Sequence, residues 1–83
     1  MKQIYYDKGE IGNNKYTFEV YQLDDGTYKA FVRRWDRRLN RVKDESVFIA
    51  VTREALREQN YPKVRQVKIF LNSNFWTHQN EQD

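Results

Sequence analysis

Cysteine is absent from this chain of 83 residues, and histidine occurs once, as His78. Without a thiol, the chain has no disulfide framework, no thiolate-ligated zinc site and no cysteine nucleophile, which fits a reducing compartment. His78 falls in a polar C-terminal segment, so no serine or threonine is expected to be held beside it as a nucleophile. Nucleophilic catalysis that depends on cysteine or histidine is therefore not expected.

Glycine and proline are also scarce, with three residues and one residue respectively. Gly9 and Gly12 lack the strand-to-helix context of a phosphate-binding loop. Turn formation accounts for the paired acids Asp24 and Asp25, and the next acidic pair, at 44–45, precedes a hydrophobic strand where solvent exposure is expected. We therefore expect a protein without enzymatic activity, without a bound metal and without another cofactor.

Long hydrophobic runs are missing as well. No apolar stretch approaches the ~20 residues of a membrane-spanning helix, and no signal-peptide-like apolar region follows Met1. These absences predict a soluble, cytoplasmic protein that does not associate with membranes.

Aromatic residues, in contrast, are abundant, at 16% of the chain. Each large ring buries roughly 150–250 Å², so a few of them can build the core of a small domain. We expect one small domain over residues 1–75, followed by a flexible C-terminal tail over residues 76–83.

The clearest predicted element is a β-hairpin around Asp24-Asp25-Gly26. Two alternating runs flank this triplet, which suits a three-residue loop that ends with glycine in the left-handed conformation. That loop pairs Val20 with Ala30 and Phe18 with Val32 on one apolar face. A two-residue turn would mix charged and apolar residues on both faces, so the three-residue loop is the self-consistent choice.

The remaining segments complete an α+β domain. The expected elements are a short strand at 3–6, a turn-rich segment at 7–14, a strand at 42–51, a short helix at 52–60 with Thr52 as its N-cap, and a last strand at 64–71 with Val67, Ile69 and Leu71 inward. A helix over 44–60 is the alternative to the third strand. The predicted order is β-β-β-β-α-β, a small two-layer domain with a mostly antiparallel sheet and one short helix over one face.

Positive charge is unevenly distributed. The net charge of the chain is +3, but residues 31–43 carry six cations and one acid. A second basic segment spans residues 61–75, while the other segments are mildly acidic. A basic segment that contains aromatic residues is typical of nucleic-acid-binding surfaces, because cations neutralise phosphates and aromatic rings stack on bases.

The hairpin register places a basic-aromatic set on the sheet face opposite the predicted core. We predict that Arg33, Arg34, Arg37, Arg38 and Arg41 contact phosphates, that Tyr21, Phe31 and Trp35 stack or wedge, and that Lys29 lies among them. Two alternatives remain open. In the first, Phe31 and Trp35 are covered by the N-terminal strand or by the aromatic pair at 75–76. In the second, Glu19 neutralises the charge of Arg33.

Two families show a similar arrangement of residues. The stretch "DDGTYKAFVRRWD…VFIAVTREAL" is similar in outline to the three-stranded sheet and helix of AP2-type and integrase arm-type DNA-binding domains. The segments "DGTYKAFV" and "TREALRE" also resemble HicB-like antitoxins, whose order is β-β-β-α-β. The first resemblance implies DNA binding and the second implies a toxin partner, and both imply a small binding domain.

The sequence therefore predicts a small non-enzymatic protein that binds nucleic acid, either DNA or RNA, through a basic-aromatic sheet face and the arginine-rich 33–41 hairpin. The alternative is a protein-binding module, such as an antitoxin, an accessory subunit or a phage-type inhibitor, in which the same face binds an acidic protein partner. An unpaired edge strand would also allow a homodimer.

Overall fold

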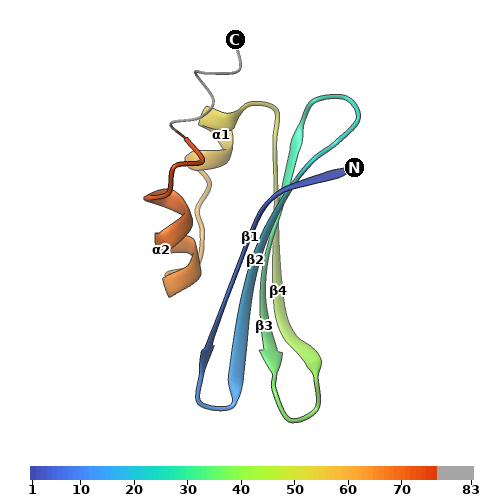
Figure 1. The fold of residues 1–83 in the computed structure, drawn as a ribbon. Coiled ribbons are helices and arrows are strands. Elements are labelled where there is room, and N and C mark those ends of the chain that lie inside the picture. Colours follow the sequence, from blue (N-terminus) through green and yellow to red (C-terminus); the bar gives the residue numbers. More distant parts are fainter. Residues whose placement is uncertain (77–83) are drawn as a thin grey trace.

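A computed structural model describes residues 1–76 and shows a four-stranded sheet followed by two short helices (Figure 1). The elements are β1 (Lys2–Ile11), β2 (Asn14–Gln22), β3 (Tyr28–Asp36), β4 (Arg41–Ala50), α1 (Arg53–Arg57) and α2 (Arg65–Leu71). Each strand pairs antiparallel with the next, so the sheet order is β1-β2-β3-β4. The predicted α+β class with a mostly antiparallel sheet is confirmed.

The central hairpin has the predicted loop and register. The N–H of Leu23 donates to the carbonyl of Thr27 at 2.8 Å, and Gly26 adopts a φ of +89°. A residue with a side chain is disfavoured at that φ, which is why glycine follows the two aspartates. Phe18 pairs with Val32, and the remaining β2–β3 pairs follow in the predicted register.

Strand β1 is longer than the predicted strand at 3–6, and the segment 7–14 is mostly strand. Only Gly12 and Asn13 separate β1 from β2. Gly9 was interpreted as a turn residue, but it lies inside β1, where a Cβ atom would stand 2.0 Å from the side-chain nitrogen of Gln66 on α2. Its role is therefore to let a helix side chain approach the strand.

Strand β4 confirms the predicted strand at 42–51, and the alternative helix over 44–60 is wrong. β-branched residues are frequent in this segment, which favours the strand. The short helix α1 begins after Thr52, whose Oγ1 accepts a hydrogen bond from the N–H of Ala55 at 3.0 Å, as its prediction as N-cap requires. Leu56 of α1 is fully buried.

The predicted last strand at 64–71 is wrong, because this segment forms helix α2. Val67 and Phe70 are buried with helical spacing, whereas Ile69, expected inward, is 43% exposed. Alternation at three positions fits a strand, but spacing of three and four residues fits a helix equally well over so short a segment. Burial of Phe70, which contacts Phe18 at 4.5 Å between ring centroids, decides between them.

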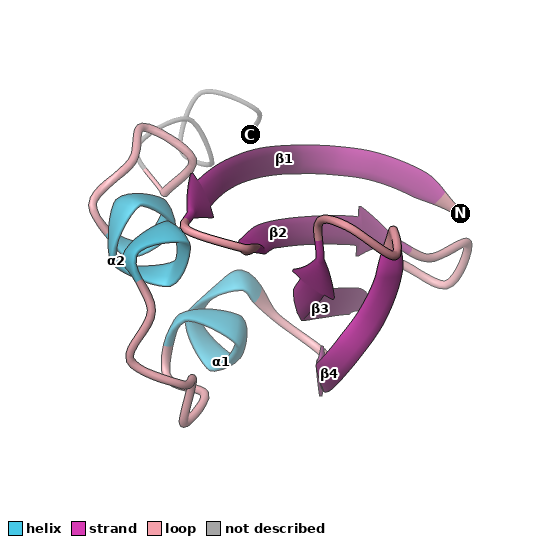
Figure 2. Ribbon diagram, turned by 90° about the horizontal axis from the view of Figure 1, so that it is seen from below, coloured by secondary structure: helices cyan, strands magenta, loops and turns pink. Residues whose placement is uncertain are grey.

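Both helices cover the same face of the sheet, which gives the two predicted layers (Figure 2). The core lies between them and consists of Phe18, Val20, Tyr28, Ala30, Val32, Ala50, Leu56, Val67 and Phe70. Trp76 was expected in the tail, but it packs on this core, and its Nε1 donates to the carbonyl of Phe70 at 3.1 Å. The rest of the predicted tail, 77–83, lies outside the described residues.

Candidate nucleic-acid interface

The sheet face opposite the helices is not covered by either helix, and we call it the outer face. Neighbouring strands contribute side chains to it in register, namely Gln3, Tyr6, Lys8, Glu10, Lys15, Thr17, Glu19, Tyr21, Lys29, Phe31, Arg33, Trp35, Val42, Glu45, Val47 and Ile49. Five of the predicted site residues lie here together: Tyr21, Lys29, Phe31, Arg33 and Trp35. Phe75 and Trp76 pack on the core instead, so they do not cover this face.

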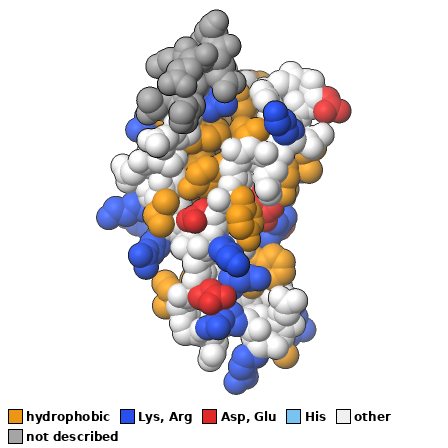
Figure 3. Space-filling view, viewed as in Figure 1, with side chains coloured by type: hydrophobic (Ala, Val, Ile, Leu, Met, Phe, Trp, Pro, Cys, Tyr) orange, Lys and Arg blue, Asp and Glu red, His pale blue; other side chains and the backbone are white. Residues whose placement is uncertain are grey.

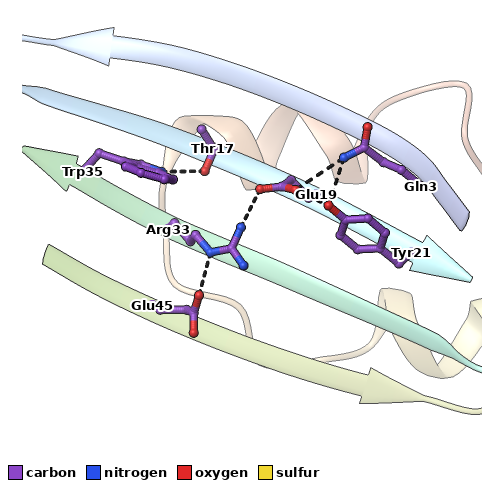
Figure 4. Close-up of polar contacts among 7 residues, drawn as sticks. All are labelled: Gln3, Thr17, Glu19, Tyr21, Arg33, Trp35 and Glu45. Atoms are coloured by element: carbon purple, nitrogen blue, oxygen red, sulfur yellow. Dashed lines mark hydrogen bonds and ion pairs between the residues drawn. The ribbon is translucent and has the colours of Figure 1, made fainter. Parts of the chain in front are cut away.

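A polar bridge crosses the middle of the outer face (Figure 4). Arg33 on β3 donates from Nη1 to Glu19 on β2 at 2.6 Å and from Nε to Glu45 on β4 at 2.5 Å. The side chains of Arg33 and Glu19 are only 21% and 12% exposed. The guanidinium is therefore committed to two carboxylates, and Arg33 is a poor phosphate ligand despite its place on the face.

Glu19 collects further donors at one end of this bridge. The hydroxyl of Tyr21 donates to its Oε1, and the side-chain amide of Gln3 donates to the same oxygen at 3.3 Å. The hydrogen bond to Glu19, together with burial, raises the pKa of Tyr21 above its ordinary value. The phenol therefore stays protonated as a donor to Glu19, while the ring of Tyr21 packs against Phe31 on the side of the bridge away from the turns.

The two remaining aromatic rings of the predicted set are already in contact with cations. The guanidinium of Arg33 lies 4.3 Å from the ring centroid of Phe31, and the ammonium of Lys15 lies 4.7 Å from that of Trp35. Trp35 also donates from Nε1 to the hydroxyl of Thr17 at 2.9 Å. Both rings are half-buried, so each offers part of one surface to a ligand.

Arg34 does not join the other predicted residues. Strand alternation points it to the helix side of the sheet, where its register partners are Tyr16 and Asp44. Its guanidinium forms an ion pair with Asp44. It was included because it belongs to the basic run in the sequence, but adjacent residues of a strand face opposite sides.

The cations gather at the end of the sheet where the β1–β2 and β3–β4 turns lie side by side (Figure 3). We call this region the basic end and define it by Lys8, Lys15, Arg37, Arg38, Arg41 and Lys43. A backbone hydrogen bond from Arg37 to the carbonyl of Asn13, at 2.9 Å, joins the two turns. Lys15 was predicted on this face by the hairpin register, but the contribution of Lys8 on β1 was not, because β1 was expected to end at residue 6.

Within the basic end, Arg37 has a structural task. Its Nη1 donates to the carbonyl of Gly12 at 2.7 Å, and its Nη2 lies 3.6 Å from Glu10. Because these contacts hold the β3–β4 turn against the β1–β2 turn, Arg37 positions its neighbours more than it offers itself to a ligand.

The tip of the β3–β4 turn presents Arg38 to solvent. Asp36 accepts hydrogen bonds through Oδ1 from the N–H groups of Leu39 and Arg38, and these bonds lower the pKa of the Asp36 carboxyl. Asn40 closes the turn with a φ of +51°. Arg38 and Arg41 are exposed, and neither forms an ion pair with the described residues 1–76. They are the arginines best placed for an external anion.

The other half of the outer face is mostly apolar, with Gln3 and Lys29 as its polar members. Tyr21, Phe31, Val47 and Ile49 lie on the side of the bridge away from the turns, and we call them the apolar half. Val47 and Ile49 are 44% and 63% exposed, and the rings of Tyr21 and Phe31 meet edge to face at 5.7 Å. Alternation along β4 places Val47 and Ile49 on this face and is the sequence signal for the patch.

Among residues 1–76, no cluster of histidine and acidic side chains has the geometry of a metal site, and no helix is long and apolar enough to cross a bilayer. Comparison with known proteins finds no matching family model, no matching curated protein and no matching solved structure. The AP2-type and HicB-like resemblances thus gain no support, and helix α2 replaces the final strand of the antitoxin order.

Proposed function

We propose that this protein binds nucleic acid through the basic end of its sheet. The observation that carries this proposal is the gathering of six cations around two adjacent turns, where Arg38 and Arg41 are exposed and their side chains form no ion pair with the described residues 1–76. Lysine and arginine contacts to phosphates supply most of the affinity of sequence-independent nucleic-acid binding.

The β3–β4 turn is the part of the site that reaches the ligand first. Asp36 and Asn40 fix its backbone, so Arg38 is displayed on a preorganised loop and loses little entropy on binding. The planar guanidinium groups of Arg38 and Arg41 suit bidentate contact with phosphate oxygens. Lys15 and Lys8 extend the positive surface across β2 and β1.

Among the aromatic residues, Trp35 is the one that lies at the basic end. Its indole is anchored by the Thr17 hydroxyl, which holds the ring in one orientation beside Lys15. We assign to it the stacking role with an unpaired base, since such stacking is worth about 1–3 kcal/mol per base. Tyr21 and Phe31 lie beyond the bridge and are left out of this role.

The proposal is tested by fluorescence anisotropy with labelled single-stranded and duplex oligonucleotides over a series of salt concentrations. Binding of the wild type should weaken steeply with salt, and Arg38→Glu/Arg41→Glu should reduce the magnitude of the log–log slope by about 2 for duplex. Neither side chain makes a described ion pair, so the variant should remain folded by circular dichroism.

The matched control is Lys63→Glu/Lys68→Glu, which makes the same change of charge at exposed positions on the helix side of the molecule. It should lower affinity slightly through net charge and leave the slope nearly unchanged. Absence of binding to either oligonucleotide at low salt, or equal loss in both double variants, would refute binding at the basic end.

A protein-binding module is the second candidate function, and the apolar half of the outer face favours it. Exposed aliphatic side chains beside aromatic rings are typical of protein interfaces, and an arginine-rich rim would attract an acidic partner. In that case the association would depend weakly on salt, and substitutions in the apolar half would affect it more than substitutions at the basic end.

A further inference from the structure

Strand β4 has a free edge whose second half is apolar. In the sheet order β4 pairs only with β3, and no backbone hydrogen bond from the described residues reaches its other side. The segment Ser46–Ala50 carries no charge, and Val47 and Ile49 on it are exposed. An unpaired and uncharged edge segment of this kind is a template for pairing with another strand.

The opposite edge of the sheet, β1, is protected against such pairing. It carries charged residues at intervals, among them Lys2, Lys8 and Glu10, and a bulge interrupts its register between Gln3 and Tyr5. Charges and bulges are the usual means of blocking an edge. The part of β4 next to the turn is protected in the same way, because residues 41–45 carry charges and the register shifts between Asp44 and Val42. Residues 46–50 have neither charge nor bulge, and they are the unprotected part of the β4 edge.

We infer that this protein forms a two-fold symmetric homodimer in which the β4 edges of two copies pair antiparallel around Phe48. In this register Val47 lies opposite Ile49 of the second copy, Ser46 lies opposite Ala50, and Phe48 lies opposite its own equivalent. The two four-stranded sheets join into one sheet of eight strands, and each copy contributes its apolar half. This inference does not depend on nucleic-acid binding.

The charges of β4 select this register. A shift by two residues toward the turn places Glu45 opposite Ile49, and a shift by four places it opposite Val47. In the proposed register Glu45 and its equivalent are six residues apart along the strands, or about 20 Å, which is beyond the Debye length at physiological salt. Every position from 46 to 50 is then opposed by an uncharged residue.

The charges near the β4 edge also favour a second copy of this chain as the partner of that edge. The acids next to the paired segment, Asp44 and Glu45, are compensated within their own chain by Arg34 and Arg33, so two copies meet without acid–acid repulsion. Antiparallel pairing around Phe48 places the two basic ends at opposite ends of the joined sheet, where their mutual repulsion is smallest. A five-residue pairing is small, so a dissociation constant in the micromolar range is expected.

The test is the mass of the full chain by sedimentation equilibrium from low to high micromolar concentration. The wild type should shift from monomer to dimer over this range. Ile49→Lys places a charge opposite Val47 twice in each dimer and should raise the dissociation constant by about 30-fold or more. Ile11→Lys, at a residue that is 57% exposed on the β1 edge, is the control and should leave dimerisation unchanged.

The register is tested by cross-linking, which is simple in a chain without cysteine. An oxidised mixture of Val47→Cys and Ile49→Cys chains should give disulfide-linked heterodimers in preference to either homodimer, because only the mixed pair is directly opposed. A wild type that stays monomeric throughout would overturn the dimer. Dimerisation unaffected by Ile49→Lys, or preferential cross-linking within one variant, would overturn this interface.

Discussion

The side chain of Arg33 separates the outer face into its two halves. It is linked to carboxylates on both neighbouring strands, and its partner Glu19 is nearly buried. Neutralisation of Arg33 by Glu19 was an alternative prediction to phosphate binding, and the ion pair between them is present. The contribution of Glu45 was not foreseen, because it required the register of β4 against β3.

At the residue scale, Arg33→Met should lower the free energy of unfolding by about 1–2 kcal/mol, because Glu19 keeps a charge that has lost its cation. Glu19→Gln/Arg33→Met should cost less than the sum of the two single substitutions, by about 1 kcal/mol of coupling. Urea denaturation followed by tryptophan fluorescence measures both quantities. Lys29→Met is the control, because Lys29 contacts Phe31 and forms no described ion pair. Additive effects of the pair would contradict a structural bridge.

At the scale of elements, local chemistry predicted the structure well wherever one signal dominated. The Asp-Asp-Gly loop fixed the β2–β3 register, and Thr52 marked the start of α1. Prediction failed where a residue or a segment was compatible with two structural roles. Glycine is common in turns, but Gly9 lies in a strand and allows the side chain of Gln66 to approach closely. The pattern of residues 64–71 fits both a strand and a helix, and only the burial of Phe70 in the core distinguishes them.

The two interpretations of residues 64–71 make opposite predictions for neighbouring side chains. In helix α2, Phe70 is fully buried and Ile69 is 43% exposed, whereas the strand would reverse them. Phe70→Ala should therefore cost about 3–4 kcal/mol of unfolding free energy, and Ile69→Ala less than about 1 kcal/mol. Denaturant unfolding of both variants gives the comparison. A larger cost for Ile69→Ala would contradict the helix and restore the strand.

The sequence predicted part of the arrangement of the outer face. Tyr21, Phe31 and Trp35 share the outer face, as alternation along the hairpin implies. Arg34 and Arg37 have partners that the sequence could not reveal, because those partners lie on other strands and turns. The number of arginines in the sequence is therefore larger than the number of arginines free to bind a ligand. That difference depends on the three-dimensional positions of their partners.

For the whole molecule, nucleic-acid binding is assigned to the basic end of the sheet and dimerisation to the edge of β4. Whether these two activities are independent can be measured. In the proposed dimer, each β3–β4 turn lies about eight residues along β4 from the two-fold axis, so the two basic ends are separated by about 50 Å. A duplex of ~10 base pairs spans about 35 Å and engages one end, whereas ~30 base pairs reach both.

Ile49→Lys should therefore leave affinity for the ~10-base-pair duplex unchanged and weaken binding to the ~30-base-pair duplex by about tenfold or more, because only the dimer gains from two linked contacts. Arg38→Glu/Arg41→Glu should weaken binding to both lengths while the dimer persists in sedimentation. The comparison requires protein concentrations at which the wild type is dimeric. An equal loss of affinity for both duplex lengths in Ile49→Lys would mean that β4 itself contacts nucleic acid. Nucleic-acid binding at the basic end and dimerisation at the β4 edge would then not be separate functions.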